Sequence, residues 1–393
     1  MFEFVALMAF TTSLVALSVD AMLPAFPDMI RDLGVAVVND MQLIISLLFI
    51  GMALGQLFYG PLSDTIGRKP AMYLGFGLFI IGSVLSMIAS DFELMLAGRF
   101  LQGVGAAGPR TVAIALIRDR YHGSEMARIM SFVMTVFMMV PIFAPALGQF
   151  ILLASGWRAI FASFVILSLM TLIWLAIRQP ETLLKPDRLP LSFKKLRMAA
   201  REVLRTRLTM VATVVSGCVS GTFIGYLNVS QRLFQEQYQL GMQFPLYFAV
   251  LAIAVGLASI MNGTLVIRFG MHKLANLALL TFMVLSWVFF LIVLLHDGHP
   301  PLWLFMTICL SLFFSLGLLF GNLNSIAMEP LGHIAGTGAA VIGSIATLLA
   351  VALGFITSHA YDGSLFPMAI GFASLATVSL LLTRLVKNAW LKE

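Results

Sequence analysis

Residues 60–70, GPLSDTIGRKP, join two apolar runs that are each long enough to cross a membrane. This short segment gathers five residues that resist hydrocarbon: Ser63, Asp64, Thr65, Arg68 and Lys69. Glycine and proline are typical of a tight turn, and Arg and Lys are typical of the cytoplasmic face of a membrane. Neither requirement explains the carboxylate of Asp64.

The composition indicates an integral membrane protein. Hydrophobic residues make up 60% of the 393 residues and charged residues only 11%, with a mean hydropathy of +0.99. Soluble proteins contain about 45–50% apolar and about 25% charged residues. The apolar runs are long and continuous rather than alternating, which favours helices over barrel strands.

We expect twelve membrane-spanning helices, at about residues 4–26, 41–62, 71–90, 94–117, 128–154, 158–178, 208–232, 244–267, 274–295, 302–327, 336–358 and 364–386. With an even number of spans, both termini lie on one side. The loops and termini of that side hold 19 of the 24 Lys and Arg, the opposite loops hold three, and two lie within spans. Both termini are therefore expected in the cytoplasm. The net charge of +6 follows from this topology, without nucleic-acid binding.

Other segments give no sign of a signal peptide, metal site or cofactor. The first span has no basic segment before it and no cleavage site, which argues against a removable signal peptide. Cys218 and Cys309 lie in separate apolar runs, so no disulfide framework or metal site is expected. His296 and His299 have a loop-like spacing and suggest no metal role.

Residues 179–207 interrupt the apolar pattern with prolines and positive charge. They divide the chain into an N-terminal six-helix bundle (1–178), a cytoplasmic linker (179–207) and a C-terminal six-helix bundle (208–393). In the linker an amphipathic helix is predicted, suited to an anionic membrane surface. A solvated linker is the alternative. The apolar face of the predicted helix would hold Phe193, Leu196, Ala200 and Leu204, with Lys194, Lys195, Arg197, Arg201 and Arg205 around the rest.

The opening segment recurs in the second half of the chain. GPLSDTIG at residues 60–67 matches GTLVIRFG at residues 263–270, and each closes the second span of its half. Ile267 stands where the first copy has Asp64. Two pseudosymmetric bundles enclose a cavity near the bilayer midplane, as in secondary transporters built from two halves.

Away from the ends of the spans, three full charges remain within them, namely Asp20, Arg99 and Arg110. Each costs at least about 2.5–3.5 kcal/mol at the bilayer centre, so each should face a cavity or a partner. A lone carboxylate in such surroundings takes up a proton readily, which makes Asp20 a candidate proton carrier and cation anchor. Alternatively Asp20 lies close enough to the outer surface to be hydrated.

Arg99 and Arg110 share the fourth span and are eleven residues apart, so both point to a similar side. One could hold a neighbouring carboxylate ionised, and the other could contact an anionic or dipolar part of a substrate. The alternative for Arg99 is contact with the outer headgroups. Neutral polar residues within spans are further candidates for the cavity: Gln42, Gln102, Tyr226, Asn228, Gln231, Asn322 and Asn324.

These motifs resemble those of the major facilitator superfamily. GPLSDTIGRK resembles its signature between the second and third helices, RFLQGVGAAG its fourth-helix motif, and SVDAMLPAFP the first-helix motif of drug–proton antiporters with twelve spans. VPIFAPALGQ resembles the fifth-helix antiporter motif, although Ala144 and Gln149 replace glycines. With GPRTVAIALIRD and EPLGHIAGTGAAVIGS, these departures point to the bicyclomycin-resistance (Bcr/CflA) branch.

The resemblance implies roles for particular residues. Asp20 would be the carboxylate coupled to proton and substrate, and Arg99 would couple protonation to the conformational switch. Pro141, Pro145 and Gly148 would shape the fifth helix so that protons do not leak. The signature residues form the predicted cytoplasmic gate: Gly60, Asp64, Gly67, Arg68 and Lys69.

A helix-dipole argument gives Asp64 a specific partner. The residue lies just beyond the negative, C-terminal end of the second helix, where a carboxylate is unfavourable. The eleventh helix begins on the same side, around GHIAGTG, and offers a positive N-terminal end. We therefore expect Asp64 to face that end and to latch the cytoplasmic side shut.

The function that follows is proton-coupled efflux of drugs or antibiotics across the bacterial inner membrane by alternating access. The protein would not be an enzyme and would need no cofactor beyond the proton gradient. Its expected partners are lipophilic small molecules, protons and the bilayer, and it would act as a monomer. A proton-coupled symporter importing a nutrient is the first alternative, and a non-transporting sensor or scaffold is the second.

Overall fold

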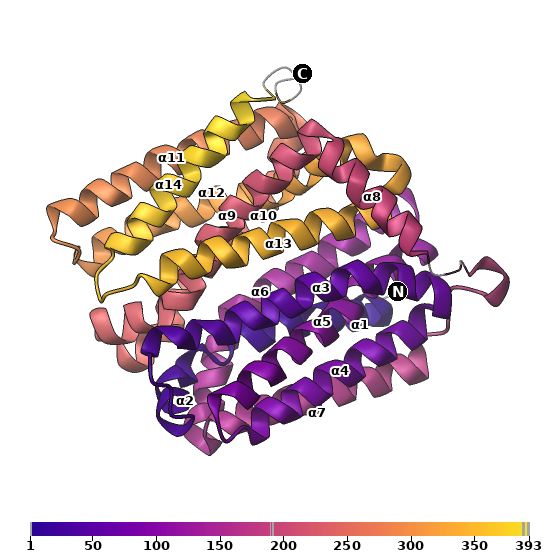
Figure 1. Ribbon diagram of the computed structural model, residues 1–393, viewed down its shortest axis with the longest axis horizontal. Helices are drawn as coiled ribbons and strands as arrows, with labels where there is room; N and C mark the ends of the chain where they lie inside the picture. The colour runs from indigo at the N-terminus through magenta and orange to yellow at the C-terminus, as the bar shows by residue number, and fades with distance from the viewer. Residues whose placement is uncertain (1, 189, 191, 387–389, 391–393) are drawn as a thin grey trace. The chain divides into compact units, whose positions relative to one another are not determined.

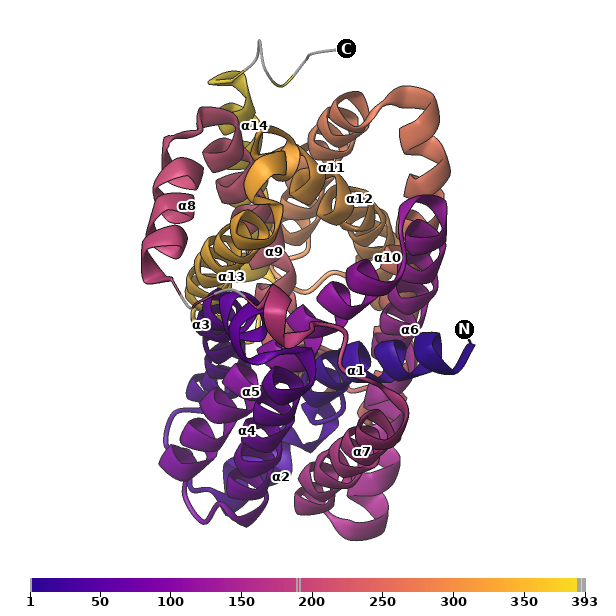
Figure 2. The same cartoon turned by 90° about the vertical axis from the view of Figure 1, so that its right-hand side faces the viewer.

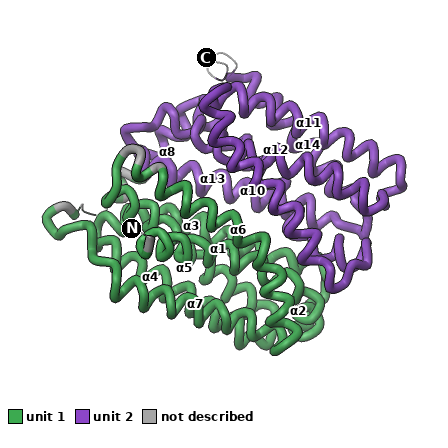
Figure 3. The backbone as a smooth tube through the Cα atoms, turned by 180° about the vertical axis from the view of Figure 1, so that it is seen from behind, with its two compact units in different colours: residues 1–197 green, residues 198–393 purple. Residues whose placement is uncertain are grey.

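The structure is a computed structural model that describes residues 2–188, 190, 192–386 and 390. The chain divides into two compact units, residues 1–197 (unit 1) and 198–393 (unit 2), shown in Figure 3. Each unit is a bundle of long apolar helices.

The spanning helices of unit 1 are α1 (Phe2–Asp20), which α2 (Phe26–Asp32) continues, α3 (Leu43–Ile66), α4 (Arg68–Ile88), α5 (Phe92–Arg120), α6 (Gly123–Ser155) and α7 (Trp157–Arg178). Those of unit 2 are α9 (Arg207–Arg232), α10 (Phe244–Phe269), α11 (Met271–Leu295), α12 (Leu302–Met328), α13 (Ala335–His359) and α14 (Phe366–Arg384). Between the two sets lies α8 (Phe193–Arg205).

The twelve predicted spans are confirmed among the described residues. Eleven stretches are long and apolar enough to cross a membrane, and one of them, Leu302–His359, contains both α12 and α13. The turn Glu329–Ile334 separates these two helices, since Leu331 leaves helical geometry at φ −110° and ψ 23°.

The opening segment is helical almost throughout, which corrects the prediction of a tight turn. Helix α3 runs through Pro61 and Asp64 to Ile66, and α4 begins at Arg68. Only Gly67 stands between them, with φ +107°, a backbone conformation that glycine adopts without strain. Asp64 therefore lies in the last turn of α3 and not beyond its end.

The second copy of the motif has the same backbone. Gly270 joins α10 to α11 with φ +77°, as Gly67 joins α3 to α4. Each unit also repeats the same neighbours: α5 packs on α3 and α4 as α12 packs on α10 and α11, and α1 packs on α6 as α9 packs on α13 (Figure 1, Figure 2). The internal repeat thus extends from sequence to packing.

Glycines bring the helices of unit 1 into close backbone contact. A methyl group at Gly103 of α5 would lie 2.0 Å from the carbonyl oxygen of Leu48 on α3. One at Gly105 would lie 2.2 Å from the backbone nitrogen of Phe79 on α4. Such close packing holds helices together in a bilayer, where the hydrophobic effect does not drive their association.

The linker contains helix α8, whose side chains differ in their burial against protein. Ala199 and Val203 are buried, whereas Leu204 is 58% exposed. Leu196 and Ala200 are only half-buried. The side chains of Phe193 and Lys195, which the prediction also used, lie outside the described part. Burial against protein therefore falls on Ala199 and Val203, and contact of the predicted apolar face with a membrane stays a prediction.

Candidate functional site

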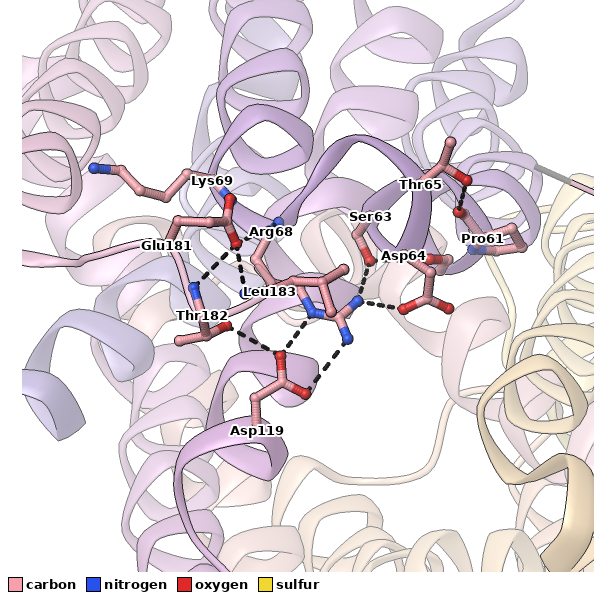
Figure 4. Close-up of polar contacts among 11 residues, drawn as sticks. Pro61, Ser63, Asp64, Thr65, Arg68, Lys69, Asp119, Glu181, Thr182 and Leu183 are labelled. Atoms are coloured by element: carbon pink, nitrogen blue, oxygen red, sulfur yellow. Dashed lines mark hydrogen bonds and ion pairs between the residues drawn. The ribbon is translucent and has the colours of Figure 1, made fainter. Parts of the chain in front are cut away.

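Arg68 is the centre of a charge cluster where α3 meets α4 (Figure 4). Its side chain is 5% exposed. Its guanidinium donates to Asp64 Oδ1 at 2.5 Å, to Ser63 Oγ at 2.8 Å and to Asp119 Oδ2 at 2.8 Å. The two carboxylates compensate the positive charge of the buried guanidinium. Loss of either one would leave part of the free-energy cost of burying that charge uncompensated.

Glu181, which follows α7, binds the start of α4 (Figure 4). Its Oε1 accepts the backbone N–H of Arg68 at 2.9 Å, and its Oε2 accepts that of Lys69 at 3.0 Å. These are two of the N–H groups that a helix start leaves without an intrahelical partner. A side chain at Gly67 would lie 2.6 Å from Oε2, so the glycine also makes room for this carboxylate.

The segment after α7 is joined to the cluster a second time through Thr182. Its hydroxyl donates to Asp119 Oδ2 at 3.0 Å, the same oxygen that Arg68 contacts (Figure 4). The backbone N–H groups of Thr182 and Leu183 both donate to Glu181 Oε1 at 3.0 Å. The first residues of the linker thus belong to the Arg68 cluster.

Sequence reasoning identified Arg68, Lys69 and Asp64 but missed Asp119 and Glu181. The sequence signal that could have indicated them is a negative charge among many positive ones. Each carboxylate stands directly after or at the end of a long apolar run, on the side whose loops are rich in Lys and Arg.

The remaining gate residues differ in role. Lys69 Nζ donates to the carbonyl of Ala176 at 3.1 Å, and the carbonyl of Gly60 accepts from Ser63 Oγ at 2.9 Å.

Replacing Glu181 by Gln should loosen the start of α4. The two carboxylate oxygens accept from the backbone N–H groups of Arg68 and Lys69. In either orientation of the Gln amide, its NH₂ group replaces one of these acceptors, so at least one of the hydrogen bonds is lost. Hydrogen bonds to charged groups contribute about 1.5–3 kcal/mol, so we expect the amides of Arg68 and Lys69 to exchange hydrogen at least about tenfold faster. Hydrogen-exchange mass spectrometry measures this directly. Glu125→Gln, on an exposed residue of α6, is the matched control, and unchanged exchange in Glu181→Gln would contradict the assignment.

Asp20 lies at the break between α1 and α2. Helix α1 ends at this residue, and a turn with a short helix, Leu23–Ala25, leads into α2. Asp20 is 4% exposed and forms no hydrogen bond or ion pair with any residue that the structure describes. The helix C-terminus carries a partial negative charge, so the position is unfavourable for an ionised carboxylate.

Arg99 is fully buried, which does not agree with contact to outer headgroups. It donates to the backbone carbonyls of Ser18 at 3.0 Å and Ile44 at 3.2 Å, and to the side-chain oxygen of Gln102. The amide of Gln102 donates in turn to Ser83 Oγ at 2.8 Å. Arg99 therefore fixes the backbone two residues before Asp20, and it does not pair with the carboxylate.

Arg110, three turns further along α5, has different surroundings. Its Nη1 lies 3.6 Å from the Met52 sulfur, and its guanidinium lies 5.6 Å from the centre of the Phe137 ring. The side chain is partly exposed, and no carboxylate among the described residues pairs with it. A cation held by sulfur and an aromatic ring can still attract an anionic or dipolar group.

The fifth-helix motif forms the face of α6 that packs on α1. Pro141 is half-buried, whereas Ala144, Pro145 and Gly148 are buried, and these positions recur at helical spacing. A methyl group at Gly148 would lie 1.7 Å from the carbonyl oxygen of Ala21, the residue after Asp20. The structure thus brings the motif against the break in α1.

Three polar candidates of unit 2 lie along α9, and all are buried. The Tyr226 ring stacks on Phe248, with ring centres 5.9 Å apart. Asn228 donates to Ser358 Oγ at 3.0 Å, and Gln231 donates to Gln235 Oε1 at 2.8 Å. The amide oxygens of Asn228 and Gln231 have no hydrogen-bond partner among the described residues.

The other neutral candidates differ in burial and in their partners. Asn322 is buried and donates to Asn262 Oδ1 at 2.6 Å and to the carbonyl of Leu318 at 2.8 Å. Asn324 is exposed, and Gln42 is buried just before α3. In the described part of the chain, His, Cys, Asp and Glu form no group of three that could hold a metal ion.

A hollow of about 630 Å³ lies elsewhere, between α10, α11 and α12 of unit 2. Its wall is mainly aliphatic, and it includes Ile253 and Leu257, which are about half exposed. None of the predicted cavity residues lines it. We therefore do not assign it to the candidate site.

Comparison with known proteins decides the family. The sequence pattern of the Major Facilitator Superfamily matches residues 8–355, most of the chain. The chain belongs to this superfamily. It is a multi-pass membrane transporter and not an enzyme.

Relatives within the superfamily include proteins named for drug resistance. A bicyclomycin resistance protein homolog of Haemophilus influenzae is 26% identical, over 97% of this chain and 95% of the relative. The multidrug resistance protein MdtL of Salmonella typhi is 28% identical, over 83% of this transporter and 80% of the relative. The crystal structure of a D-xylose–proton symporter has the same fold, with a TM-score of 0.75 at 14% identity and coverage of 97% and 96%.

Proposed function

We propose that this transporter exports lipophilic small molecules, antibiotics among them, in exchange for protons across the bacterial inner membrane. The observation that carries the proposal is Asp20, a buried carboxylate without a partner among the described residues at the break in α1. Such a group can bind a proton in one state and a substrate in another. The relatives named for bicyclomycin and multidrug resistance support the same substrate class.

The driving force is adequate for export. One proton that crosses the membrane releases about 2.3 kcal/mol per 100 mV, before any pH gradient is counted. We propose that the two six-helix bundles rock to expose the site to each side in turn, with both termini in the cytoplasm and the protein acting as a monomer. No cofactor is needed.

We assign the remaining residues by their surroundings. Arg99 positions Asp20, since it holds the carbonyl of Ser18 at 3.0 Å. The groups best able to contact substrate are Arg110 and the amide oxygens of Asn228 and Gln231, which have no hydrogen-bond partner among the described residues. Pro141, Pro145 and Gly148 keep α6 close to α1.

The rival function is import of a nutrient with protons. The likeness to the D-xylose–proton symporter concerns the fold alone, at 14% identity. Export is tested by measuring drug accumulation and susceptibility, across a panel of compounds, in cells that express the protein and cells that do not. We expect less accumulation and greater resistance for at least one lipophilic drug. Unchanged accumulation of every compound, with proton-dependent uptake of a nutrient, would favour import.

Asp64 is proposed to latch the cytoplasmic side shut against the start of α13. Asp64→Asn should reduce turnover several-fold and change drug affinity little, because its described partner is Arg68 and not a candidate cavity residue. Loss of the Asp64 charge should lower the stability, since Arg68 is buried, but Arg68 keeps its contact with Asp119 at 2.8 Å and the Asn side-chain oxygen can still accept from it, so the variant should fold. Rates in proteoliposomes and equilibrium drug binding give the two readouts, with Asp40→Asn as control. Equal loss of both quantities would indicate misfolding and contradict a gate.

A further inference from the structure

Helix α8 has one side that packs on protein and one side that does not. Ala199 and Val203 are buried, with exposures of 3% and 0%. Between them in the chain, Glu202 contacts Nε2 of His333 at 2.8 Å, and both residues are in unit 2. These contacts fix which side of the helix faces outwards.

The outward side carries four basic residues. Lys194, Arg197, Arg201 and Arg205 are exposed, and none forms a hydrogen bond or ion pair with a described residue. At 3.6 residues per turn they fall within an arc of about 80°. Four like charges on so narrow an arc repel one another, which favours an anionic partner.

Two apolar side chains flank this basic stripe. Met198 follows one edge of the arc and Leu204 the other, with exposures of 60% and 58%. A water-exposed linker has no need of large apolar groups on both sides of its charges. Cations in the centre with apolar groups at the edges match the boundary between phosphate headgroups and acyl chains.

The place of α8 in the chain brings it to that boundary. A single residue, Thr206, separates Arg205 from α9, which is a membrane-spanning helix that begins at Arg207. The basic end of α8 therefore lies where the chain enters the bilayer. This continuity favours lipid over an acidic soluble protein as the partner.

We propose that the outward face of α8 binds the phosphate headgroups of anionic phospholipids, with Lys194, Arg197, Arg201 and Arg205 as the cationic contacts and Met198 and Leu204 among the upper acyl chains. The site holds the linker against the membrane surface. It is independent of the transported substrate and of the proton site.

The test uses the purified full-length protein, stripped of lipid and titrated with phosphatidylglycerol or phosphatidylcholine under native mass spectrometry. The wild type should retain phosphatidylglycerol preferentially. Each basic residue near an anionic surface strengthens attraction by about fivefold. Replacing Lys194, Arg197, Arg201 and Arg205 together by Gln should therefore weaken phosphatidylglycerol binding by at least about tenfold, with phosphatidylcholine binding unchanged.

The charge-retaining variant Arg197→Lys, Arg201→Lys, Arg205→Lys is the matched control and should keep the preference. Thermal stability of the Gln variant should match the wild type, since the replaced side chains are exposed and pair with no described residue. This separates lost binding from misfolding. A photoactivatable phosphatidylglycerol should label the α8 peptide of the wild type and not of the Gln variant. Equal phosphatidylglycerol binding by wild type and Gln variant would overturn the proposal. The same result is expected if the true partner of this face is an acidic soluble protein.

Discussion

Replacing Asp20 by Asn should abolish transport driven by a pH gradient. Asn has nearly the same shape as Asp but cannot exchange a proton at neutral pH. Because Asp20 is 4% exposed and has no partner among the described residues, the change removes no structural contact and relieves the cost of a buried charge. We therefore expect the variant to fold at least as stably as the wild type and yet to lose coupling.

Two readouts in proteoliposomes separate coupling from binding. Drug flux driven by an imposed pH gradient should fall to the level of empty vesicles. Drug–drug exchange in the absence of a gradient needs no proton, so it should persist for a neutral drug, whose binding does not require the charge of Asp20. Asp28→Asn is the control, because it makes the same chemical change on a partly exposed carboxylate of α2. Gradient-driven flux that continued unchanged in Asp20→Asn would remove Asp20 from the mechanism.

The course of the helices could be predicted because hydrocarbon imposes a length and a composition on each span. The predicted spans at about 244–267 and 274–295 correspond to α10 and α11, Phe244–Phe269 and Met271–Leu295. The backbone of residues 60–70 could not be predicted in this way. Pro61 and Asp64 suggest a turn, yet the helix continues to Ile66 because Arg68 neutralises the carboxylate and Gly67 alone makes the reversal.

Partners of side chains could not be predicted in the same way, because they depend on contacts between residues far apart in sequence. Nothing in the pattern around Arg68 indicates that Asp119 and Glu181 approach it, since Asp119 lies in the last turn of α5 and Glu181 follows α7. One of Arg99 and Arg110 was expected to hold a neighbouring carboxylate, whereas Arg99 donates to backbone carbonyls and Gln102. A linear sequence gives the charge and the depth of such a residue but not the atom that it meets.

Gly148→Ala should both destabilise the protein and impair transport, although it adds only one methyl group. The new Cβ would lie 1.7 Å from the carbonyl oxygen of Ala21, so α6 and the break in α1 must separate. Overpacking of this kind costs about 1–3 kcal/mol and sometimes more. Asp20 precedes the displaced carbonyl, so gradient-driven transport should fall together with the melting temperature.

Gly77→Ala makes the same change where it has no such consequence. Gly77 lies within α4, and a Cβ there meets no atom within 4 Å apart from its chain neighbours and the adjacent backbone of its own helix. Alanine favours a helix over glycine by up to about 1 kcal/mol, so this control should be as stable as the wild type or slightly more stable. Thermal unfolding in detergent and flux in proteoliposomes compare the pair. If Gly148→Ala unfolded and transported like Gly77→Ala, the close contact between α6 and the break in α1 would have no part in holding Asp20 in place.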